Sequence, residues 1–445
     1  MTRRVDRRRF LQASAAAGAA TWLAGGTLLG QQTRSPNERL NIGIIGAGGR
    51  GEGNIAGVRG ENIVALCDVD ENRAGKQFEA FPKATKYHDF RRMLEKEKLD
   101  AVVISTPDHT HAVAAVMAMS LGKHVYCEKP LTWSVEEARV LRKVAQKMKV
   151  ATQMGNQGTA AQGLRTAVEV VRAGIIGPVR EVHVWTNRPI WDQGMQEAPP
   201  PEPVPAHLKW DLWLGPAAER PYSPKYLPFA WRGWWDFGTG ALGDMACHTA
   251  NMAFMALKLG APKRVSAESG GGSELSPPKW STITYTFPER GEGFPEVKLI
   301  WYDGTRDGKR NLPPAELLPG VKMPTSGSLL IGEKGSLFSP DDYGAVFHPL
   351  PKEKFEGVKM PEPTLPRSPG HHQEWILACK GGPPAMSNFD YAGPLTEFVL
   401  LGNVAVRAGK PIEWDAESLK VTNVPEADKF IRREYRKGFE LGASV

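Results

Sequence analysis

Residues 40–51 read LNIGIIGAGGRG, and this stretch decides the fold. Its first half is an apolar strand, and glycines follow in the spacing G-x-G-x-x-G where the strand ends. Such glycines allow a tight turn and let backbone N–H groups approach a pyrophosphate at the N-terminus of the next helix. The stretch therefore predicts a dinucleotide site, and the residues expected to contact the cofactor there are Gly46, Gly48, Gly49, Arg50 and Gly51.

The second apolar strand, Ile63–Asp68, ends in an acidic residue. A carboxylate at this place accepts hydrogen bonds from both hydroxyls of the adenosine ribose and repels a 2′-phosphate. Asp68 therefore favours NAD over NADP. The nearby Arg50 and Arg73 are able to accommodate a phosphate, which keeps NADP as the less favoured cofactor.

Short apolar strands alternate with helical stretches from Leu40 to Met154. Besides the two strands already named, strands are predicted at Ala101–Thr106, His124–Glu128 and Val150–Met154, with helices at Asp89–Glu97, His111–Leu121 and Val135–Met148. This alternation is typical of a parallel sheet that is covered by helices on both faces. We therefore expect a doubly wound Rossmann domain that binds NAD over residues 38–155.

After Gly155 the regular alternation of short strands and helices ends. A Pro- and Trp-rich stretch, residues 188–235, has little periodicity. The predicted strands are Arg180–Asn187, Ser281–Phe287, Glu296–Tyr302, Ser328–Ile331 and Gly335–Ser339, and the predicted helices are Ala160–Ala173, His372–Lys380 and Pro394–Ala408. Their spacing favours hairpins. Residues 156–445 are therefore expected to form a C-terminal α/β domain with a large, mostly antiparallel open sheet. Its open face would serve substrate binding or the assembly of a homo-oligomer.

The formal charge of +7 is concentrated at the start of the chain, where the first 34 residues contain six arginines and one aspartate. The remainder is nearly neutral and has no basic run, so nothing predicts a nucleic-acid partner. Residues 7–12 read RRRFLQ, which resembles a twin-arginine signal, and the Ala- and Gly-rich residues 13–30 suit its apolar region. We expect a signal segment at residues 1–34, the twin-arginine translocase as a partner, and a periplasmic or exported protein. An uncleaved membrane anchor is the alternative.

The four cysteines, Cys67, Cys127, Cys247 and Cys379, are far apart and lie in apolar runs. They are expected to be small buried side chains, because no CxxC pattern is present. The adjacent pair His371 and His372 resembles a metal cluster only superficially, since neighbouring residues on a helix point about 100° apart. No metal is expected.

Two further signatures follow predicted strands: residues 106–111 read TPDHTH and residues 128–130 read EKP. Both lie at carboxyl ends of strands, where open α/β sheets bind ligands. With the glycine motif, they resemble the Gfo/Idh/MocA family, named after glucose-fructose oxidoreductase, inositol dehydrogenase and a rhizopine catabolism protein. The resemblance extends over about residues 38–430. Residues 185–189 and 387–391 look like the exported bacterial branch of that family.

The resemblance implies a catalytic set of Lys129, Asp244 and His248. The Lys129 ammonium would lie beside the nicotinamide and hold the reacting oxygen. Asp244 and His248 are four residues apart, so a helix places both on one face. His248 would exchange the hydroxyl proton, and Asp244 would orient it or bind a substrate hydroxyl. Alternatively, Asp244 is merely a helix N-cap and His248 a buried structural histidine.

Further cofactor contacts are expected from the strand ends and the crossover between domains: Thr106, Pro107, Asp108, His111, Glu128, Lys129 and Asn156. Substrate contacts are expected from Gln157, Asn187, Arg188, Trp235 and Asn251. Asn251 departs from the family pattern, which commonly has an aspartate here, and an amide cannot take up a proton. The tryptophans of residues 185–235 are interpreted either as a stacking surface for a sugar or as ordinary core packing.

These observations predict an NAD(P)-dependent oxidoreductase that transfers hydride between a secondary alcohol of a sugar or polyol and a tightly bound nicotinamide cofactor. Two alternatives stay open. One is an NAD-dependent glycosidase that cleaves a glycoside through a transient keto-sugar. The other is an inactive carbohydrate-binding protein in which NAD is structural.

Overall fold

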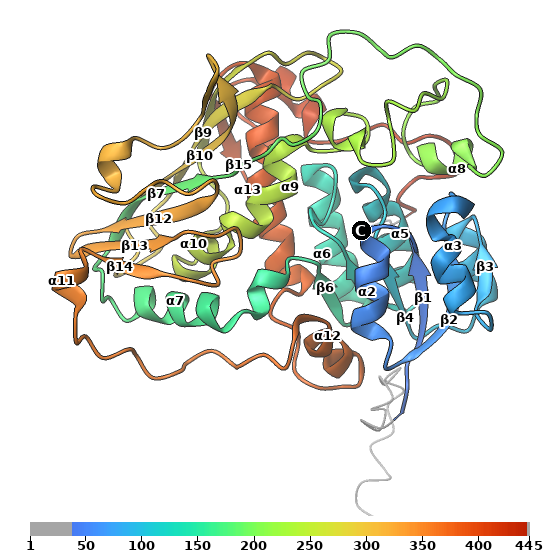
Figure 1. Cartoon of the computed structure of the whole chain (residues 1–445), viewed down its shortest axis with the longest axis horizontal. Coiled ribbons are helices and arrows are strands. Elements are labelled where there is room, and N and C mark those ends of the chain that lie inside the picture. Colours follow the sequence, from blue (N-terminus) through green and yellow to red (C-terminus); the bar gives the residue numbers. More distant parts are fainter. Residues whose placement is uncertain (1–37, 443–445) are drawn as a thin grey trace, which may run out of the picture. The chain divides into compact units, whose positions relative to one another are not determined.

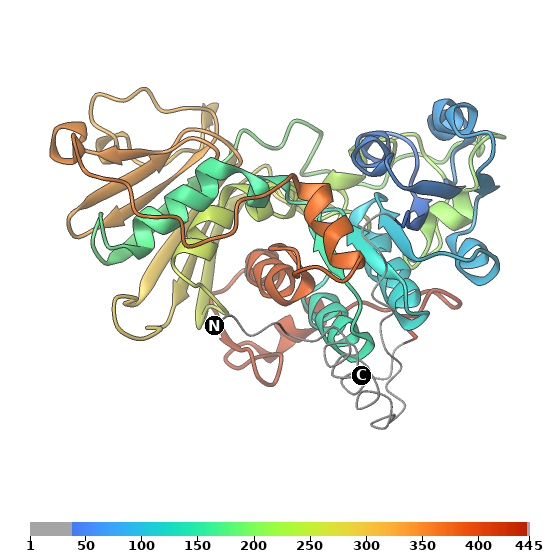
Figure 2. The same ribbon diagram turned by 90° about the horizontal axis from the view of Figure 1, so that it is seen from below.

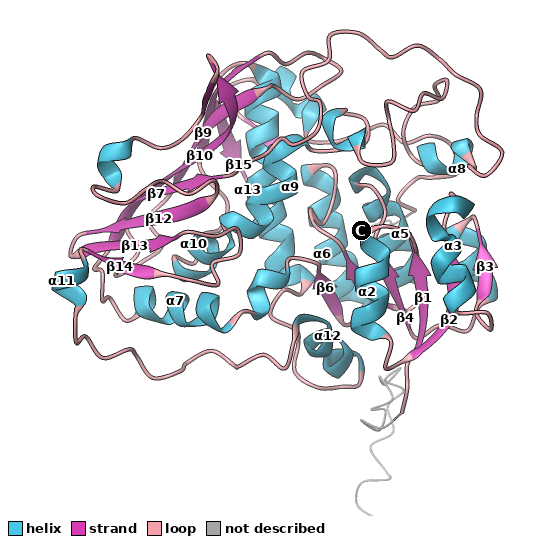
Figure 3. Cartoon of the chain, viewed as in Figure 1, coloured by secondary structure: helices cyan, strands magenta, loops and turns pink. Residues whose placement is uncertain are grey.

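The computed structural model describes residues 38–442 of the chain (Figure 1). The predicted twin-arginine segment, residues 1–34, lies outside these described residues. Within residues 38–442, no helix is both long and apolar enough to cross a membrane. Figure 3 distinguishes the helices of this region from its strands.

The first sheet has six parallel strands in the order β3-β2-β1-β4-β5-β6. Their bounds are β1 Asn41–Ile45, β2 Asn62–Cys67, β3 Thr85–Tyr87, β4 Ala101–Ile104, β5 His124–Cys127 and β6 Thr152–Met154. The predicted doubly wound fold is therefore confirmed, with all five predicted strands present. Strand β3 was not predicted, because its three residues, TKY, carry no apolar pattern, and two of them are exposed.

Five helices connect these strands: α2 Arg50–Val58, α3 Glu71–Ala80, α4 Phe90–Lys96, α5 Asp108–Ser120 and α6 Val135–Met148. Their starts follow from local capping. The Asp70 side chain accepts hydrogen bonds from two backbone N–H groups of α3, and Ser134 forms a capping box with Glu137 in α6. Helix α5 begins three residues before the predicted position, because Pro107 precedes it and Asp108 suits a helical first turn.

The core of this sheet is completed by a helix from the far end of the chain. In α12, His371–Cys379, three side chains (Trp375, Ile376 and Cys379) join a buried cluster with Ile42 of β1 and Tyr126 of β5. A buried ion pair, Lys380 Nζ to Glu61 Oε1 at 2.7 Å, fixes the end of this helix. The Rossmann sheet and residues beyond 370 therefore share one hydrophobic core.

The second sheet has ten strands, ordered β14-β13-β12-β7-β10-β9-β8-β15-β16 with β11 paired to β10. Their bounds are β7 Val179–Trp185, β8 Arg264–Gly270, β9 Trp280–Phe287, β10 Val297–Arg306, β11 Lys309–Arg310, β12 Gly327–Gly332, β13 Gly335–Ser339, β14 His348–Leu350, β15 Ile412–Asp415 and β16 Lys420–Val421. Among the described strands of this second sheet, only β7 and β10 pair in parallel, so the predicted mostly antiparallel sheet is confirmed. Side chains of β9 alternate between buried and half-buried, as expected of a sheet with one packed face.

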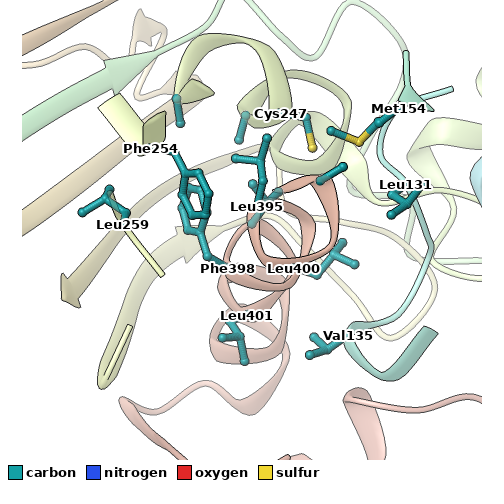
Figure 4. Close-up of a cluster of buried hydrophobic side chains, with 14 of the residues drawn as sticks. Leu131, Val135, Met154, Cys247, Phe254, Leu259, Leu395, Phe398, Leu400 and Leu401 are labelled. Carbon is teal, nitrogen blue, oxygen red and sulfur yellow. The ribbon is translucent and has the colours of Figure 1, made fainter. Parts of the chain in front are cut away.

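The remaining helices of the described chain are α7 Gln162–Arg172, α8 Trp210–Leu214, α9 Gly240–Thr249, α10 Asn251–Ala256, α11 Lys352–Phe355 and α13 Phe389–Ala408. Short 3₁₀ turns are η1 Gln157–Ala160, η2 Ala230–Gly233, η3 Ala315–Leu317 and η4 Pro425–Phe430. Helix α13 begins five residues before the predicted Pro394, because the Asn388 side chain caps it. Figure 4 shows Leu395 and Phe398 of α13 packed near Phe254 of α10.

The Pro- and Trp-rich stretch of residues 188–235 is ordered by its own aromatic cluster. Trp210, Trp213, Tyr226 and Phe237 are buried against one another. Backbone hydrogen bonds tie the stretch to the loop after β2, because Lys209 N–H donates to the Val69 carbonyl at 2.9 Å. The stretch therefore lies beside the carboxyl ends of the Rossmann strands.

Candidate functional site

A cavity of about 470 Å³ lies at the carboxyl ends of β1, β2, β4 and β5. The second half of the chain closes it with residues of η2, α9 and the loop around Tyr343. Of the residues predicted to form the site, the cavity wall includes Gly46, Gly48, Gly49, Arg50, Asp68, Thr106, Pro107, Asp108, Glu128, Lys129, Gln157, Arg188, Asp244 and His248. Both halves of the chain therefore contribute to one site.

The glycine turn has the geometry that its spacing predicts. Gly46 and Gly49 have φ angles of +83° and +59°, which side chains other than glycine rarely adopt. A Cβ on Gly51 would lie 1.9 Å from the Gly46 carbonyl oxygen, so the third glycine allows α2 to approach the end of β1. Gly51 itself does not line the cavity. Gly51 instead allows close packing of the helix against the strand, which is the role of the third glycine in such motifs.

Asp68 closes the other side of this turn. Its Oδ2 accepts the Gly48 N–H at 2.9 Å, and its Oδ1 accepts the Asp70 N–H at 3.0 Å. Burial raises the pKa of Asp68, although these two hydrogen bonds oppose the shift. Nearby, the Thr106 hydroxyl is buried without a hydrogen-bond partner among the described residues. An unpaired hydroxyl and a carboxylate in one wall suit the ribose and amide groups of a dinucleotide.

Lys129 joins the two halves of the chain across the cavity. Its Nζ lies 2.8 Å from Asp244 Oδ1 and 2.5 Å from the Asp244 carbonyl oxygen, 115 residues away in sequence. Arg232 Nε donates to the same Oδ1 at 3.1 Å. Burial would raise the pKa of Asp244, but Lys129 and Arg232 hold it well below its ordinary value. Asp244 is therefore an ionised carboxylate at neutral pH.

His248 lies one turn after Asp244 on α9, and both side chains line the cavity. Burial, and then the positive charge of Lys129, lower the pKa of His248 well below its ordinary value of 6.5. Its Nδ1 is buried with no partner among the described residues, and its ring lies edge-on to Tyr343 at 4.9 Å. The imidazole is therefore neutral and has a free nitrogen, which suits a general base.

The N-cap interpretation of Asp244 is wrong, because α9 begins four residues earlier, after Thr239. The expected orientation of His248 by Asp244 is also not seen. The Asp244 carboxylate contacts Lys129 and the guanidinium groups of Arg232 and Arg188 instead. Asp244 therefore positions the ammonium group, a role that the spacing of Asp244 and His248 alone did not indicate.

Glu128 and Asp108 line the cavity but are already paired within the protein. Glu128 accepts hydrogen bonds from Arg50 Nε at 2.8 Å and from Asn54 Nδ2 at 2.9 Å. Burial would raise the pKa of Glu128, but Arg50 and Asn54 keep it lowered. Asp108 accepts the Thr239 hydroxyl at 2.7 Å. Both carboxylates thus hold the cavity walls in place.

The structure does not bring His111 or Asn156 to the cavity as cofactor contacts. The ring nitrogens of His111 lie 2.8 and 2.9 Å from the carbonyl oxygens of Pro130 and Thr106. His111 therefore ties together the two loops whose sequences are TPDHTH and EKP. Asn156 is fully buried, where its amide contacts the Cys247 carbonyl and the Ser387 hydroxyl.

Three of the five predicted substrate contacts also lie outside the cavity wall. Asn251 is buried and satisfied by Thr159 at 2.9 Å and by the Tyr391 hydroxyl at 2.6 Å, so its amide is structural. The Trp235 indole donates to the Ser273 carbonyl at 3.2 Å. Asn187 accepts a hydrogen bond from the neighbouring guanidinium of Arg188.

Several cavity residues were not predicted: Arg232, Trp213, Phe229, Tyr343 and Phe439. Trp231, one of the tryptophans interpreted either as a stacking surface for a sugar or as core packing, also lines the cavity. Most of these residues lie in aperiodic stretches, where no spacing indicates which side chains point inward. The tryptophans otherwise follow the core-packing interpretation, since Trp185 stacks on Phe338 within a separate buried cluster.

The cysteines and the histidine pair have structural environments. All four cysteines are free and buried, as predicted. His371 contacts the Met154 carbonyl at 2.8 Å, and His372 stacks on Tyr126 with ring centres 4.9 Å apart. Within residues 38–442, no group of three metal-binding side chains is close enough to hold an ion.

Comparison with curated proteins gives relatives of three kinds. A glycosyl hydrolase family 109 protein of Solibacter usitatus is 37% identical over 116 residues, 23% of this chain and 26% of that protein. Inositol 2-dehydrogenase of Rubrobacter xylanophilus is 36% identical over 110 residues, 24% and 31% of the two chains. The rhizopine catabolism protein MocA of Rhizobium meliloti is 29% identical over 163 residues, 36% and 49% of the two chains. The chain thus spans between about a quarter and a half of the length of these relatives.

Solved structures share the fold over most of the chain. The WlbA dehydrogenase from Bordetella pertussis, in complex with NADH and UDP-GlcNAcA, has a TM-score of 0.60 at 16% identity and covers 85% of this chain and 99% of its own. An inositol dehydrogenase homolog from Azotobacter vinelandii, complexed with NADH and myo-inositol, has a TM-score of 0.56 at 15% identity, covering 86% and 100%. At these identities the likeness shows the fold.

Two family models together match more than half of the chain. The model described as the oxidoreductase family, NAD-binding Rossmann fold, matches residues 40–156. The model described as the oxidoreductase family, C-terminal alpha/beta domain, matches residues 165–293. Both carry the same family name, and the first agrees with the predicted NAD site. The chain therefore belongs to the Gfo/Idh/MocA family of NAD-binding oxidoreductases.

Proposed function

We propose that this protein transfers hydride between a secondary alcohol carbon of a sugar or polyol and a bound NAD. The observation that carries the proposal is the contact of Lys129 Nζ with Asp244 Oδ1 at 2.8 Å. The cavity that contains this contact is also lined by His248 of α9 and by the glycine turn, which supports the proposal. The inositol 2-dehydrogenase among the relatives agrees with this chemistry.

The chain's own residues divide the reaction between them. Bound NAD supplies the carbon that accepts hydride. Lys129 holds the substrate oxygen and favours its ionisation, and the neutral His248 takes the hydroxyl proton while the C–H bond releases hydride and the carbonyl forms. Asp244 holds the ammonium of Lys129 in place. Gly46, Gly48, Gly49, Asp68 and Thr106 would bind the dinucleotide.

The test is a panel of sugars and polyols added to the purified protein with NAD. A dehydrogenase accumulates a keto-sugar and the near-ultraviolet absorbance of NADH. If no member of a broad panel yields either product while the protein binds NAD, the proposed net oxidation is wrong.

A second candidate is NAD-dependent glycoside hydrolysis, which the relatives named glycosyl hydrolase family 109 proteins favour. A transient ketone acidifies the neighbouring C–H bond and permits elimination of the leaving group. Water addition and re-reduction then complete hydrolysis with no net redox change. Release of free sugar from an aryl glycoside, without added NAD and without NADH, would distinguish this activity from dehydrogenation.

We also propose that the protein is exported in a folded state through the twin-arginine translocase and works as a homo-oligomer in the periplasm or beyond. The motif RRRFLQ at residues 7–12 supports the route, and the open face of the second sheet supports assembly. Because free dinucleotide is scarce outside the cytoplasm, such a protein needs to retain its cofactor.

The C-terminal segment offers a means of retention that gives a prediction. Phe439 lines the cavity, as do His88 and Phe90, and the Arg91 guanidinium lies 4.0 Å from the Phe439 ring centre. The purified protein is expected to release NAD, rather than NADP, on denaturation. Phe439→Ala is expected to weaken NAD binding about tenfold, because one base-stacking contact contributes about 1–3 kcal/mol.

The measurement is the dinucleotide content after gel filtration, together with the dissociation constant from titration of the stripped protein. Phe294→Ala is a matched control, because Lys258 covers the Phe294 ring at 4.8 Å and that ring does not line the cavity. Equal NAD retention by the two variants would refute a role for Phe439.

A further inference from the structure

The substrate end of the cavity holds more positive charge than its carboxylate balances. Three cations surround Asp244: Lys129 Nζ and Arg232 Nε lie 2.8 and 3.1 Å from Oδ1, and Arg188 Nε lies 3.6 Å from Oδ2. Their side chains are only 14%, 20% and 22% exposed, respectively. One carboxylate neutralises one of these charges. Two guanidinium charges therefore remain in a half-enclosed space, where charge is costly unless it is paired.

Three other acids that line the cavity, Glu128, Asp108 and Asp68, have hydrogen-bond partners of their own. Glu128 is bound to Arg50 at 2.8 Å, on the side of the glycine turn. Asp108 is buried and accepts the Thr239 hydroxyl; burial raises its pKa, while the nearby charges of Lys129 and Arg232 act to lower it. Even an ionised Asp108 leaves one of the three positive charges around Asp244 unbalanced. Asp68 lies at the opposite end of the cavity with its own backbone partners. The excess charge around Asp244 is therefore a property of the substrate end.

The two guanidinium groups are held in fixed positions but keep donors free. The Arg232 guanidinium lies 4.1 Å from the ring centre of Trp231 and 4.4 Å from that of Phe229. Arg188 is anchored by the Asn187 side chain. Within residues 38–442, Nη2 of both arginines has no protein hydrogen-bond acceptor. A rigid fork with free donors suits a carboxylate or another oxyanion.

We propose that the substrate is a sugar that carries an anionic group, a carboxylate or a sulfate ester, bound by Arg188 and Arg232. This inference rests on the proposed function and names its substrate class. Lys129 and His248 act on a hydroxyl, and the two arginines bind the acid group of the same sugar. Phe229, which lines the cavity and is 45% exposed, faces the sugar at the entrance. Neutral sugars leave the two guanidinium charges unpaired and bind more weakly.

The experiment measures dissociation constants by calorimetry on the purified protein with its bound dinucleotide. Each acid is paired with its neutral counterpart: D-glucuronate with D-glucose and D-glucuronamide, D-galacturonate with D-galactose, and D-glucose 6-sulfate with D-glucose. At least one acid is expected to bind about tenfold or more tightly than its counterpart, since charge-assisted bidentate pairs are the strong ones. Whether the uronates or the sulfate ester show the preference identifies the oxyanion.

Variants assign that preference to the two arginines. Arg188→Gln and Arg232→Gln are each expected to reduce the ratio of acid to neutral affinity to about threefold or less, while Arg232→Lys keeps part of it. Arg306→Gln is the matched control and should keep the full ratio. Arg306 also covers a tryptophan, Trp280, and pairs with Glu268, but it does not line the cavity. Because each ratio is taken within one variant, a partly destabilised protein does not distort it.

Equal affinity for acid and neutral sugars, no measurable binding of any acid, or a ratio unchanged in both glutamine variants overturns the proposal. NADH absorbance, read in the same samples, separates it from the proposed function. Selective binding of an acid without NADH from any sugar refutes dehydrogenation and leaves the anion site standing. If NADH forms from neutral sugars as readily as from their acids, dehydrogenation is supported and the anion site is refuted.

Discussion

Lys129→Ala is expected to lower kcat about a thousandfold with a much smaller change in KM, the effect of losing one charged donor at a developing oxyanion. In the wild type the ammonium lies 2.8 Å from the Asp244 carboxylate and lines the cavity. Alanine leaves nothing there to hold or ionise the substrate oxygen. Steady-state kinetics with the best substrate of the panel, followed by NADH absorbance, gives both constants.

The fold should survive this change, because Arg232 and Arg188 still balance Asp244. The content of bound NAD checks this independently of turnover. Lys143→Ala, which removes an exposed lysine on α6, is the control for the loss of a positive charge. A Lys129→Ala protein with kcat within tenfold of the wild type would rule out the proposed role.

His248→Ala is expected to lower kcat about a hundredfold, within the range that general-base catalysis contributes. The variant also tests the pH dependence. Burial and the charge of Lys129 lower the pKa of His248 below 6.5, so the ring is already the neutral base at pH 7. As the pH falls, the wild-type rate should therefore not begin to decline at pH 6.5. It should decline only at a lower pH, where the His248 imidazole becomes protonated.

The acid limb of the profile of kcat/KM against pH should be absent in His248→Ala, because the group that titrates is gone. His88→Ala is the control and should keep the acid limb. This half-exposed histidine also lines the cavity, but it lies near Asp68. An acid limb that persists in His248→Ala, or that lies at pH 6.5 or above in the wild type, would show that another group takes the proton.

The sequence predicted the parts of the site that depend on short-range rules. The glycine turn and Asp68 are found from the ends of two apolar strands, because parallel strands bring their carboxyl ends to one edge. Asp244 and His248 share a helix face for the same local reason. Strand β3 was missed because its three residues, two exposed and one half-buried, carry no periodic signal.

Contacts between distant segments could not be predicted in this way. The charge of Asp244 is shared with Arg232 from η2 and with Lys129 from the end of β5, and no spacing connects these segments. His111 and Asn251, predicted as ligand contacts, lie outside the cavity wall for a related reason. Their polar atoms are satisfied by other groups of the protein, the Thr106 and Pro130 carbonyls for His111 and the Thr159 and Tyr391 hydroxyls for Asn251. Composition and spacing do not reveal such pairings.

The placement of α12 has a consequence for how the chain folds. Trp375 packs fully buried against Tyr126, and Lys380 reaches Glu61, which also accepts the Leu40 N–H at the start of β1. A ribosome makes β1 long before it makes this helix, so the nascent nucleotide-binding half leaves the ribosome with apolar surface still open to water. Such long-range closure slows folding and extends the time during which chaperones act. The dinucleotide half therefore matures only after α12 has been synthesised.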